Sequence, residues 1–178
     1  MVPRPRHRRR ARACKGGRTY AIVEAGARPY ELTEELETIG ACDFDGTLPG
    51  GYTAHPKRDP ETGELHAVSY YWGWGNKVQY TVVGTDARVR RTVDIEVTGS
   101  PMMHDFAFTQ RFAAIFDLPV TLSAQAAASG YRFPYRWNPN HGAKVGLLPR
   151  EGEAKDIVWC NADSCFIFHA INAWDAAD

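Results

Sequence analysis

The sequence predicts an all-β fold of the sandwich, barrel or propeller class. Short segments rich in β-branched and aromatic residues recur about every ten residues, with glycine- or proline-containing turns between them. No second domain boundary is visible, and 178 residues suit one domain. The chain is 44% hydrophobic and 24% charged, which excludes a wholly disordered or fibrous protein. No apolar run approaches the ~20 residues that cross a bilayer, so we expect no integral membrane segment.

Residues 1–17 form a basic leader that we expect to be disordered, ahead of a single domain over residues 18–178. Residues 1–18 hold eight of the 21 basic side chains and no acidic one, which leaves 13 basic against 21 acidic, a net of −8, in the remainder. A nucleic-acid-binding fold carries its positive charge on the folded domain, so this acidic domain argues against a nucleic-acid partner. No apolar segment typical of a signal peptide follows the basic residues.

The cysteines indicate an intracellular protein without a zinc ribbon. They are Cys14, Cys42, Cys160 and Cys165, and they form neither a CxxC pair nor a zinc-ligand spacing. Without a secretory signal, we expect reduced thiols and a cytoplasmic location. Cys165 lies in the apolar run Cys165–Phe168, which predicts a position in the core.

The first part of the domain alternates strand candidates with turns. Arg18–Glu24 is a strand candidate, and Ala25–Pro29 is a turn. Glu31–Thr38 has the composition of a polar loop or a single helical turn. A pair of glycines, Gly50–Gly51, interrupts the next segment, which ends where proline imposes an extended conformation on His55.

The remaining strand candidates follow the turn predicted at Asp59–Gly63. They are Glu64–Trp72, Lys77–Val83, Val89–Val97, Met102–Thr109, Arg111–Leu118, Val145–Leu148, Ile157–Cys160 and Cys165–His169. Thr109 and Gln110 separate two of these strands, which predicts a hairpin. The alanine-rich stretch Ala124–Ser129 predicts a helical turn, and Tyr131–Pro139 predicts an irregular aromatic loop.

Histidines are the most informative residues for function. Three of the six are interpreted as structural or solvent-exposed: His7, His66 and His141. His55, His104 and His169 lie at strand edges, 49 and 65 residues apart. A propeller blade takes roughly 40–50 residues, so histidines on successive blades would converge on the central axis and form a metal site. The spacing alone leaves core or surface positions open, and the chain contains neither HExxH nor GxSxG.

Specific motifs surround these three histidines. They are Thr53–Pro56 followed by Asp59–Leu65, then Met102–Phe106, then Phe168–Asp175. Four further characteristic segments precede these motifs along the chain: Ala21–Gly26, Pro29–Leu32, Gly40–Phe44 and Leu48–Gly51. On these motifs the chain, from about residue 18 onward, resembles the carotenoid cleavage oxygenase family, which includes apocarotenoid and lignostilbene dioxygenases and a retinoid isomerohydrolase.

The resemblance implies a seven-bladed β-propeller with Fe(II) on its axis, held by four histidines. Three of these correspond to His55, His104 and His169, and Glu24 corresponds to a glutamate that orients a ligand ring. The implied reaction uses O2 to cleave a C=C bond of a carotenoid, apocarotenoid or stilbene-type substrate into two carbonyl products. Aromatic residues that could line the substrate tunnel, or else pack structurally, are Phe106, Tyr131, Phe133, Tyr135 and Trp137.

The chain matches the central part of the family pattern, so we expect a partial β-propeller of about three of the seven blades. As an isolated chain it is expected to bind iron weakly and to have little activity. Two alternatives stay open: an inactive propeller fragment that acts as a binding module or remnant, and a zinc hydrolase on a β scaffold. An apolar polyene or stilbene substrate also leaves peripheral membrane contact open.

Overall fold

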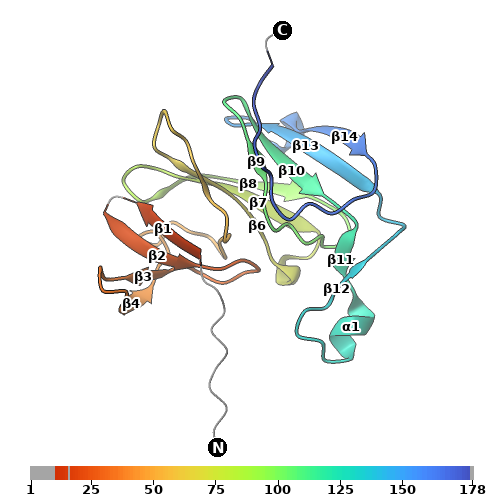
Figure 1. The fold of residues 1–178 in the computed structure, drawn as a ribbon, viewed down its shortest axis with the longest axis horizontal. Helices are drawn as coiled ribbons and strands as arrows, with labels where there is room; N and C mark the ends of the chain where they lie inside the picture. Colours follow the sequence, from red (N-terminus) through yellow and green to blue (C-terminus); the bar gives the residue numbers. More distant parts are fainter. Residues whose placement is uncertain (1–10, 16, 177–178) are drawn as a thin grey trace, which may run out of the picture.

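A computed structural model describes residues 11–15 and 17–176 and confirms the all-β class. These residues form three four-stranded sheets and one two-stranded sheet, which Figure 1 shows as separate units. A four-stranded antiparallel sheet is the unit of a β-propeller blade. Within the described residues the sheets do not close into a ring. No helix in this part of the chain is long and apolar enough to cross a membrane.

The first sheet has the spatial order β1-β2-β3-β4. Its strands are β1 (Ala11–Lys15), β2 (Arg18–Ile22), β3 (Tyr30–Leu32) and β4 (Thr38–Ala41). Strand β1 lies inside the range 1–17, for which the sequence predicted a disordered leader. It is ordered as a strand because it pairs with β2 over all its residues. Residues 1–10 of the predicted leader lie outside the described residues.

The polar loop predicted at Glu31–Thr38 is confirmed over residues 33–37, which form the turn of the hairpin β3–β4. In its turn, Thr33 Oγ1 accepts a hydrogen bond from the Glu37 N–H at 3.2 Å, and Leu36 has a φ of 68°. Only the ends of the segment are strand, because Glu31 and Leu32 pair with β2 and Thr38 pairs with Leu32.

The second sheet packs against both other four-stranded sheets, because its strand β6 is buried on both faces. Its strands are β5 (Lys57–Arg58), β6 (Leu65–Tyr70), β7 (Lys77–Val83) and β8 (Val89–Glu96). All of β6 is buried. Leu65 and Ala67 join a hydrophobic cluster shared with the first sheet, whereas Val68 and Tyr70 join one shared with the third sheet. Successive side chains of a strand point to opposite faces, so β6 contributes to both cores.

The third sheet has the order β14-β13-β10-β9. Its strands are β9 (Ala107–Phe108), β10 (Phe112–Asp117), β13 (Ala143–Pro149) and β14 (Val158–Ala162). The hairpin predicted around Thr109 and Gln110 is confirmed as β9–β10. Residues 102–106, predicted as strand, have no regular secondary structure and lead into β9 as a loop.

Short elements complete the fold. Strands β11 (Val120–Leu122) and β12 (Tyr135–Trp137) form the two-stranded sheet, and two 3-10 helices occupy Trp72–Trp74 and Ala154–Asp156. Helix α1 (Ala124–Ala128) confirms the predicted helical turn, and Ser123 caps it by accepting a hydrogen bond from the Ala126 N–H. The segment Tyr131–Pro139, predicted to be an irregular loop, contains strand β12. The strand forms because these residues pair with β11.

Two predictions at the C-terminal end are wrong. Residues 163–176, the C-terminal strap, form no strand, although Cys165–His169 was predicted as one. Cys165 is exposed rather than in the core. The apolar run does not pair with a sheet, and of its residues only Phe166 packs against the hydrophobic cluster of the second and third sheets. Figure 1 shows the strap crossing the hairpin β9–β10 as an extended segment.

His66 is a buried structural residue, as the sequence indicated. Its Nδ1 lies 2.6 Å from the Tyr80 hydroxyl, and its Nε2 lies 3.3 Å from Arg150 Nη2. A guanidinium can only donate, so Nε2 accepts, and the ring is neutral with its proton on Nδ1. Burial, and then the charge of Arg150, lower the pKa of His66 from 6.5 to about 4.

We predict that His66 makes the stability of the chain depend on pH. A neutral buried ring stabilises the fold fully above pH 6.5, and this stability is lost as pH falls toward 4, because the unfolded chain takes up a proton first. The pKa difference corresponds to roughly 3 kcal/mol. Denaturant titrations across this range should show a smaller pH dependence in His66→Gln than in the unmodified chain. Equal pH dependence in the two proteins would contradict the assignment.

Gly51, the second residue of the glycine pair, allows two loops to touch. A Cβ atom on Gly51 would lie 2.5 Å from the Cα of Gly26. The adjacent Tyr52 N–H donates a hydrogen bond to the Ala27 carbonyl at 2.9 Å. This contact docks the loop that leads to His55 against the loop that follows Glu24.

Replacing Gly51 by alanine should therefore destabilise the fold. The obstructing atoms belong to backbone, which cannot rotate away, so we expect a loss of roughly 1–3 kcal/mol in the free energy of unfolding. Gly40→Ala is the matched control, because a Cβ atom there meets no atom within 4 Å. Comparable stabilities of the two variants in denaturant would show that the loop contact is unimportant.

Candidate metal centre

The structure brings His55, His104 and His169 together from three separate loops. His55 precedes β5, His104 precedes β9, and His169 lies in the C-terminal strap. Among the described residues these three form the one group of histidine, cysteine or acidic side chains arranged to hold a metal ion, with one ligand atom from each lying within 4.8 Å of the others. The spacing argument, by itself, left this convergence open.

The rings face one another closely. Ring centroids are 4.5 Å apart for His55 and His104, 4.7 Å for His55 and His169, and 4.9 Å for His104 and His169. The Nε2 atoms of His55 and His104 are 3.1 Å apart. Two nitrogens bound to one metal at about 2.0–2.1 Å lie about 3 Å apart, so this pair has the separation of neighbouring ligands.

Glu24 orients His104. The His104 Nδ1–H donates a hydrogen bond to Glu24 Oε2 at 2.8 Å, and both side chains are mostly buried. With the proton held on Nδ1, the lone pair of Nε2 points toward His55 and is available to a metal. The sequence could not say which histidine Glu24 contacts, and the structure gives His104.

The electrostatic surroundings keep His55 in the form that binds metals. Burial, and then the neighbouring His104 ring, lower the pKa of His55. A neutral imidazole carries the lone pair that a metal requires. The His55 backbone is held by its own N–H, which donates to Thr53 Oγ1 at 3.2 Å.

Two buried tyrosines, Tyr70 and Tyr135, lie close enough to Glu24 to be influenced by its charge. Burial first, and the Glu24 carboxylate second, raise the pKa of Tyr70, and the same two causes raise the pKa of Tyr135 to about 12. The two rings pack edge to face with centroids 6.0 Å apart. Both phenols therefore stay neutral beside the carboxylate.

Sequence reasoning missed a second carboxylate at the site, Asp105. Its side chain is 2% exposed, and its Oδ1 lies 2.7 Å from Lys57 Nζ. Its Oδ2 lies 3.5 Å from His169 Nδ1. Burial is the largest influence and acts to raise the pKa of Asp105, but the hydrogen bonds from Lys57 and from the Phe106 N–H, together with the charge of Lys57, hold the pKa below its ordinary value. The signal that could have found it is its position directly after His104.

The donor set fits a divalent transition metal. Imidazole suits iron, copper, nickel and zinc, and all three rings offer a nitrogen to one point. Buried carboxylates lie behind His104 and His169, an arrangement typical of metal-binding histidines. The described geometry of these residues is therefore compatible with the Fe(II) that the motifs implied.

The other residues singled out from the sequence lie apart from this cluster. His66 is buried between sheets, and His141 pairs with the buried Asp117, its Nε2 2.6 Å from Asp117 Oδ1. His7 lies outside the described residues. Of the candidate tunnel aromatics, two are buried, Phe106 and Tyr135, and three are exposed, Tyr131, Phe133 and Trp137.

Comparison with known proteins agrees with this geometry. The family model described as "Retinal pigment epithelial membrane protein" matches residues 13–178. A carotenoid cleavage oxygenase of Mycobacterium tuberculosis is 48% identical over 196 residues, covering 89% of this chain and 39% of that protein. The chain thus spans about two fifths of the length of this relative.

Solved structures match the fold. A lignostilbene dioxygenase of Pseudomonas brassicacearum has a TM-score of 0.77 at 30% identity, covering 85% of this chain and 32% of its own. A cobalt-substituted apocarotenoid oxygenase of Synechocystis has a TM-score of 0.75 at 25% identity, covering 94% and 37%. The prediction of a partial β-propeller is confirmed. The sequence motifs, the blade-like sheets and these matches together show that the chain belongs to the carotenoid cleavage oxygenase family.

Proposed function

We propose that this chain carries the metal centre of a non-haem Fe(II) dioxygenase. The reaction cleaves a C=C bond of a carotenoid, apocarotenoid or stilbene-type substrate with O2 and gives two carbonyl products. The observation that carries the proposal is the convergence of three imidazoles on one point, with Glu24 behind His104. Family membership supports oxidative cleavage of a double bond as the reaction class.

The residues of the centre have two roles: the histidines would bind the metal, and Glu24 orients one of them. When bound, Fe(II) supplies a redox-active site that activates O2 beside the alkene. His55, His104 and His169 would hold it through neutral nitrogens, which leave the positive charge of the metal undiminished. Glu24 keeps the His104 proton on Nδ1, away from the metal.

The names of the relatives support an apolar, extended substrate. One matched protein is named a carotenoid oxygenase, one a lignostilbene dioxygenase, and one an apocarotenoid oxygenase. Polyenes and stilbenes are both long, flat and apolar, so the same metal centre can act on either. The residues that line the substrate-binding cavity and place one double bond beside the metal would select between them.

A specific observation also favours the alternative of an inactive binding module. The His169 side chain is 58% exposed, whereas those of His104 and Glu24 are 18% and 22% exposed. A solvent-exposed ligand weakens metal binding and admits water to the site. Metal binding and turnover together separate the two candidates.

The first prediction for this site concerns metal binding. Anaerobic calorimetry with Fe(II) should show binding that His104→Ala abolishes. Glu24→Gln should lower the affinity on the order of 10–100-fold, because the ring loses its orienting carboxylate. His141→Ala is the control, since His141 lies outside the cluster and pairs with Asp117. Full metal retention in His104→Ala would rule out the ligand assignment, and a preference for zinc without oxygen consumption would favour the hydrolase alternative.

The second prediction concerns the reaction. The Fe(II)-loaded chain, incubated with a stilbene or an apocarotenoid under ¹⁸O2, should give carbonyl products that carry label from O2, in the small yield expected of the isolated chain. The products should disappear in His104→Ala and without iron, and mass spectrometry measures both. A chain that binds iron at these histidines yet forms no product from either substrate would be the inactive module instead.

A further inference from the structure

We propose that Asp175 is a positioning residue, which docks the C-terminal strap on the turn of the hairpin β9–β10 and thereby sets where His169 lies. The hydrogen-bond partners of Asp175 are Thr109 and Arg111, so it acts on the metal centre through the strap and not on a ligand ring. The inference rests on the proposed metal centre and adds to it a contact six residues beyond His169.

Both oxygens of the Asp175 carboxylate bind the turn. Oδ1 accepts a hydrogen bond from Thr109 Oγ1, and Oδ2 accepts one from the Arg111 N–H, both at 3.0 Å. The Arg111 Nε lies 3.5 Å from Oδ1, and the Asp175 side chain is 15% exposed. Burial acts to raise the pKa of Asp175, but the hydrogen bonds from Thr109 and Arg111 hold the pKa below its ordinary value. The carboxylate therefore stays ionised at neutral pH, and hydrogen bonds to an ionised acceptor are the stronger kind.

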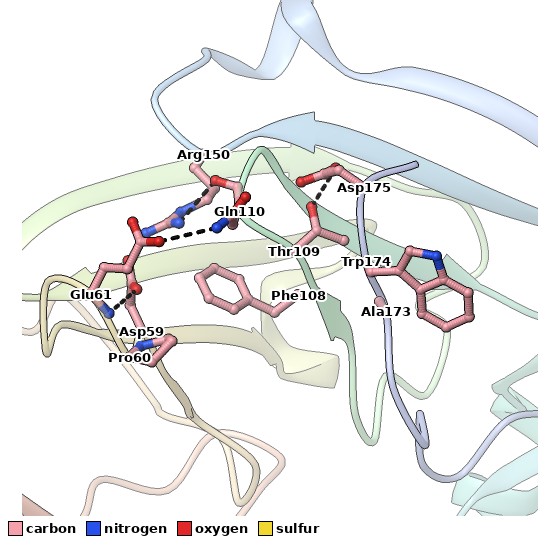
Figure 2. Close-up of a pocket in the computed structure, with 10 residues that line it drawn as sticks. All are labelled: Asp59, Pro60, Glu61, Phe108, Thr109, Gln110, Arg150, Ala173, Trp174 and Asp175. Atoms are coloured by element: carbon pink, nitrogen blue, oxygen red, sulfur yellow. Dashed lines mark hydrogen bonds and ion pairs between the residues drawn. The ribbon is translucent and has the colours of Figure 1, made fainter. Parts of the chain in front are cut away.

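The turn that receives Asp175 is fixed to two sheets. Arg150, which follows β13 of the third sheet, donates to the Gln110 carbonyl at 2.9 Å. Gln110 Nε2 donates to Glu61 Oε1 at 3.0 Å, and Glu61 lies between β5 and β6 of the second sheet. Figure 2 shows these side chains around the turn, with Asp175 reaching it from the strap. The same hairpin begins three residues after His104, so the strap is docked on a segment that carries another proposed ligand.

The rest of the strap is weakly held. It pairs with no strand of the described residues, and three of its large apolar side chains are more than half exposed: Phe168, Ile171 and Trp174. Between Ala170 and Asp175 the strap borders two cavities of about 270 and 360 Å³, the first of which Figure 2 shows. Ala170 is bound by one hydrogen bond of 3.3 Å, from its N–H to Asp105 Oδ2. A segment with few buried apolar contacts opens easily, so the strap depends on the anchors at Ala170 and Asp175.

Docking at Asp175 matters for metal binding because His169 is not fixed by its own packing. The His169 side chain is 58% exposed. A metal that needs all three rings binds only those molecules in which the strap is docked, so the apparent affinity falls with the docked fraction. Loss of hydrogen bonds to an ionised carboxylate lowers a docking equilibrium constant on the order of 10–100-fold.

Amide exchange in the metal-free chain tests the docking directly. The Ala170 N–H is the reporter, because it donates to Asp105 from within the strap. Measured by NMR, Asp175→Ala should speed exchange of this amide on the order of 10–100-fold and leave the amides of β6 and β7 unchanged. Anaerobic calorimetry should show an Fe(II) affinity that is lower by the same order. Thr109→Val removes the hydroxyl donor and should act in the same direction, and the effects of the two substitutions should not add.

Asp94→Ala is the matched control, because Asp94 is an aspartate of β8 that pairs with Lys77 and does not contact the strap. It should change neither Ala170 exchange nor Fe(II) affinity. Unchanged exchange or unchanged affinity in folded Asp175→Ala would overturn the proposal. If that variant failed to fold, unprotected exchange of the Ala170 amide in the unmodified chain would still overturn it. Iron binding that His104→Ala leaves intact would instead refute the metal centre, while Ala170 exchange would still test the docking by Asp175.

Discussion

The centre depends on forcing three uncharged rings, each carried by an irregular loop, to face one point. Imidazoles have no attraction strong enough to do this unaided, so the loops must be held from behind. Glu24 holds the His104 ring at 2.8 Å, and the buried carboxylate of Asp105 joins the segments of the other two histidines. Hydrogen bonds to ionised groups are about twice as strong as neutral ones, so these two carboxylates contribute more to the placement of the loops than neutral acceptors would.

The sheets make these contacts possible by fixing where each loop starts. Strand β6 is buried on both sides and belongs to two hydrophobic clusters, so it sets the first and third sheets relative to each other. Glu24 lies two residues after the end of β2. The close contact of Gly51 with Gly26 brings the loop that carries His55 against the loop that carries Glu24. The geometry of the site is thus a consequence of sheet packing and of one glycine contact.

The sequence predicted strongly patterned elements and failed where long-range pairing decides. Lys77–Val83 agrees with β7 residue for residue, because its β-branched and aromatic side chains fit a buried strand. The polar segment Glu31–Thr38 is a loop over residues 33–37 as its composition predicts, but its ends join strands through pairing that no local pattern indicates. Apolar character alone predicts Cys165 in the core, but the residue is exposed because its segment pairs with no strand of the described residues. For the site, family motifs identified three histidines and Glu24, but no local pattern could reveal that Asp105 reaches residue 170.

The charges around the centre favour a divalent cation without using up its reactivity. Glu24 and Asp105 contribute two negative charges, and Lys57 offsets one of them. Both carboxylates contact the far nitrogens of the rings, so they would stabilise a bound cation through the imidazoles instead of coordinating it. Tyr70 and Tyr135 add no further negative charge, because their raised pKa values keep both phenols neutral. A metal held this way would keep most of its positive charge in a partly buried site, because its ligands are neutral and the carboxylates lie one ring away.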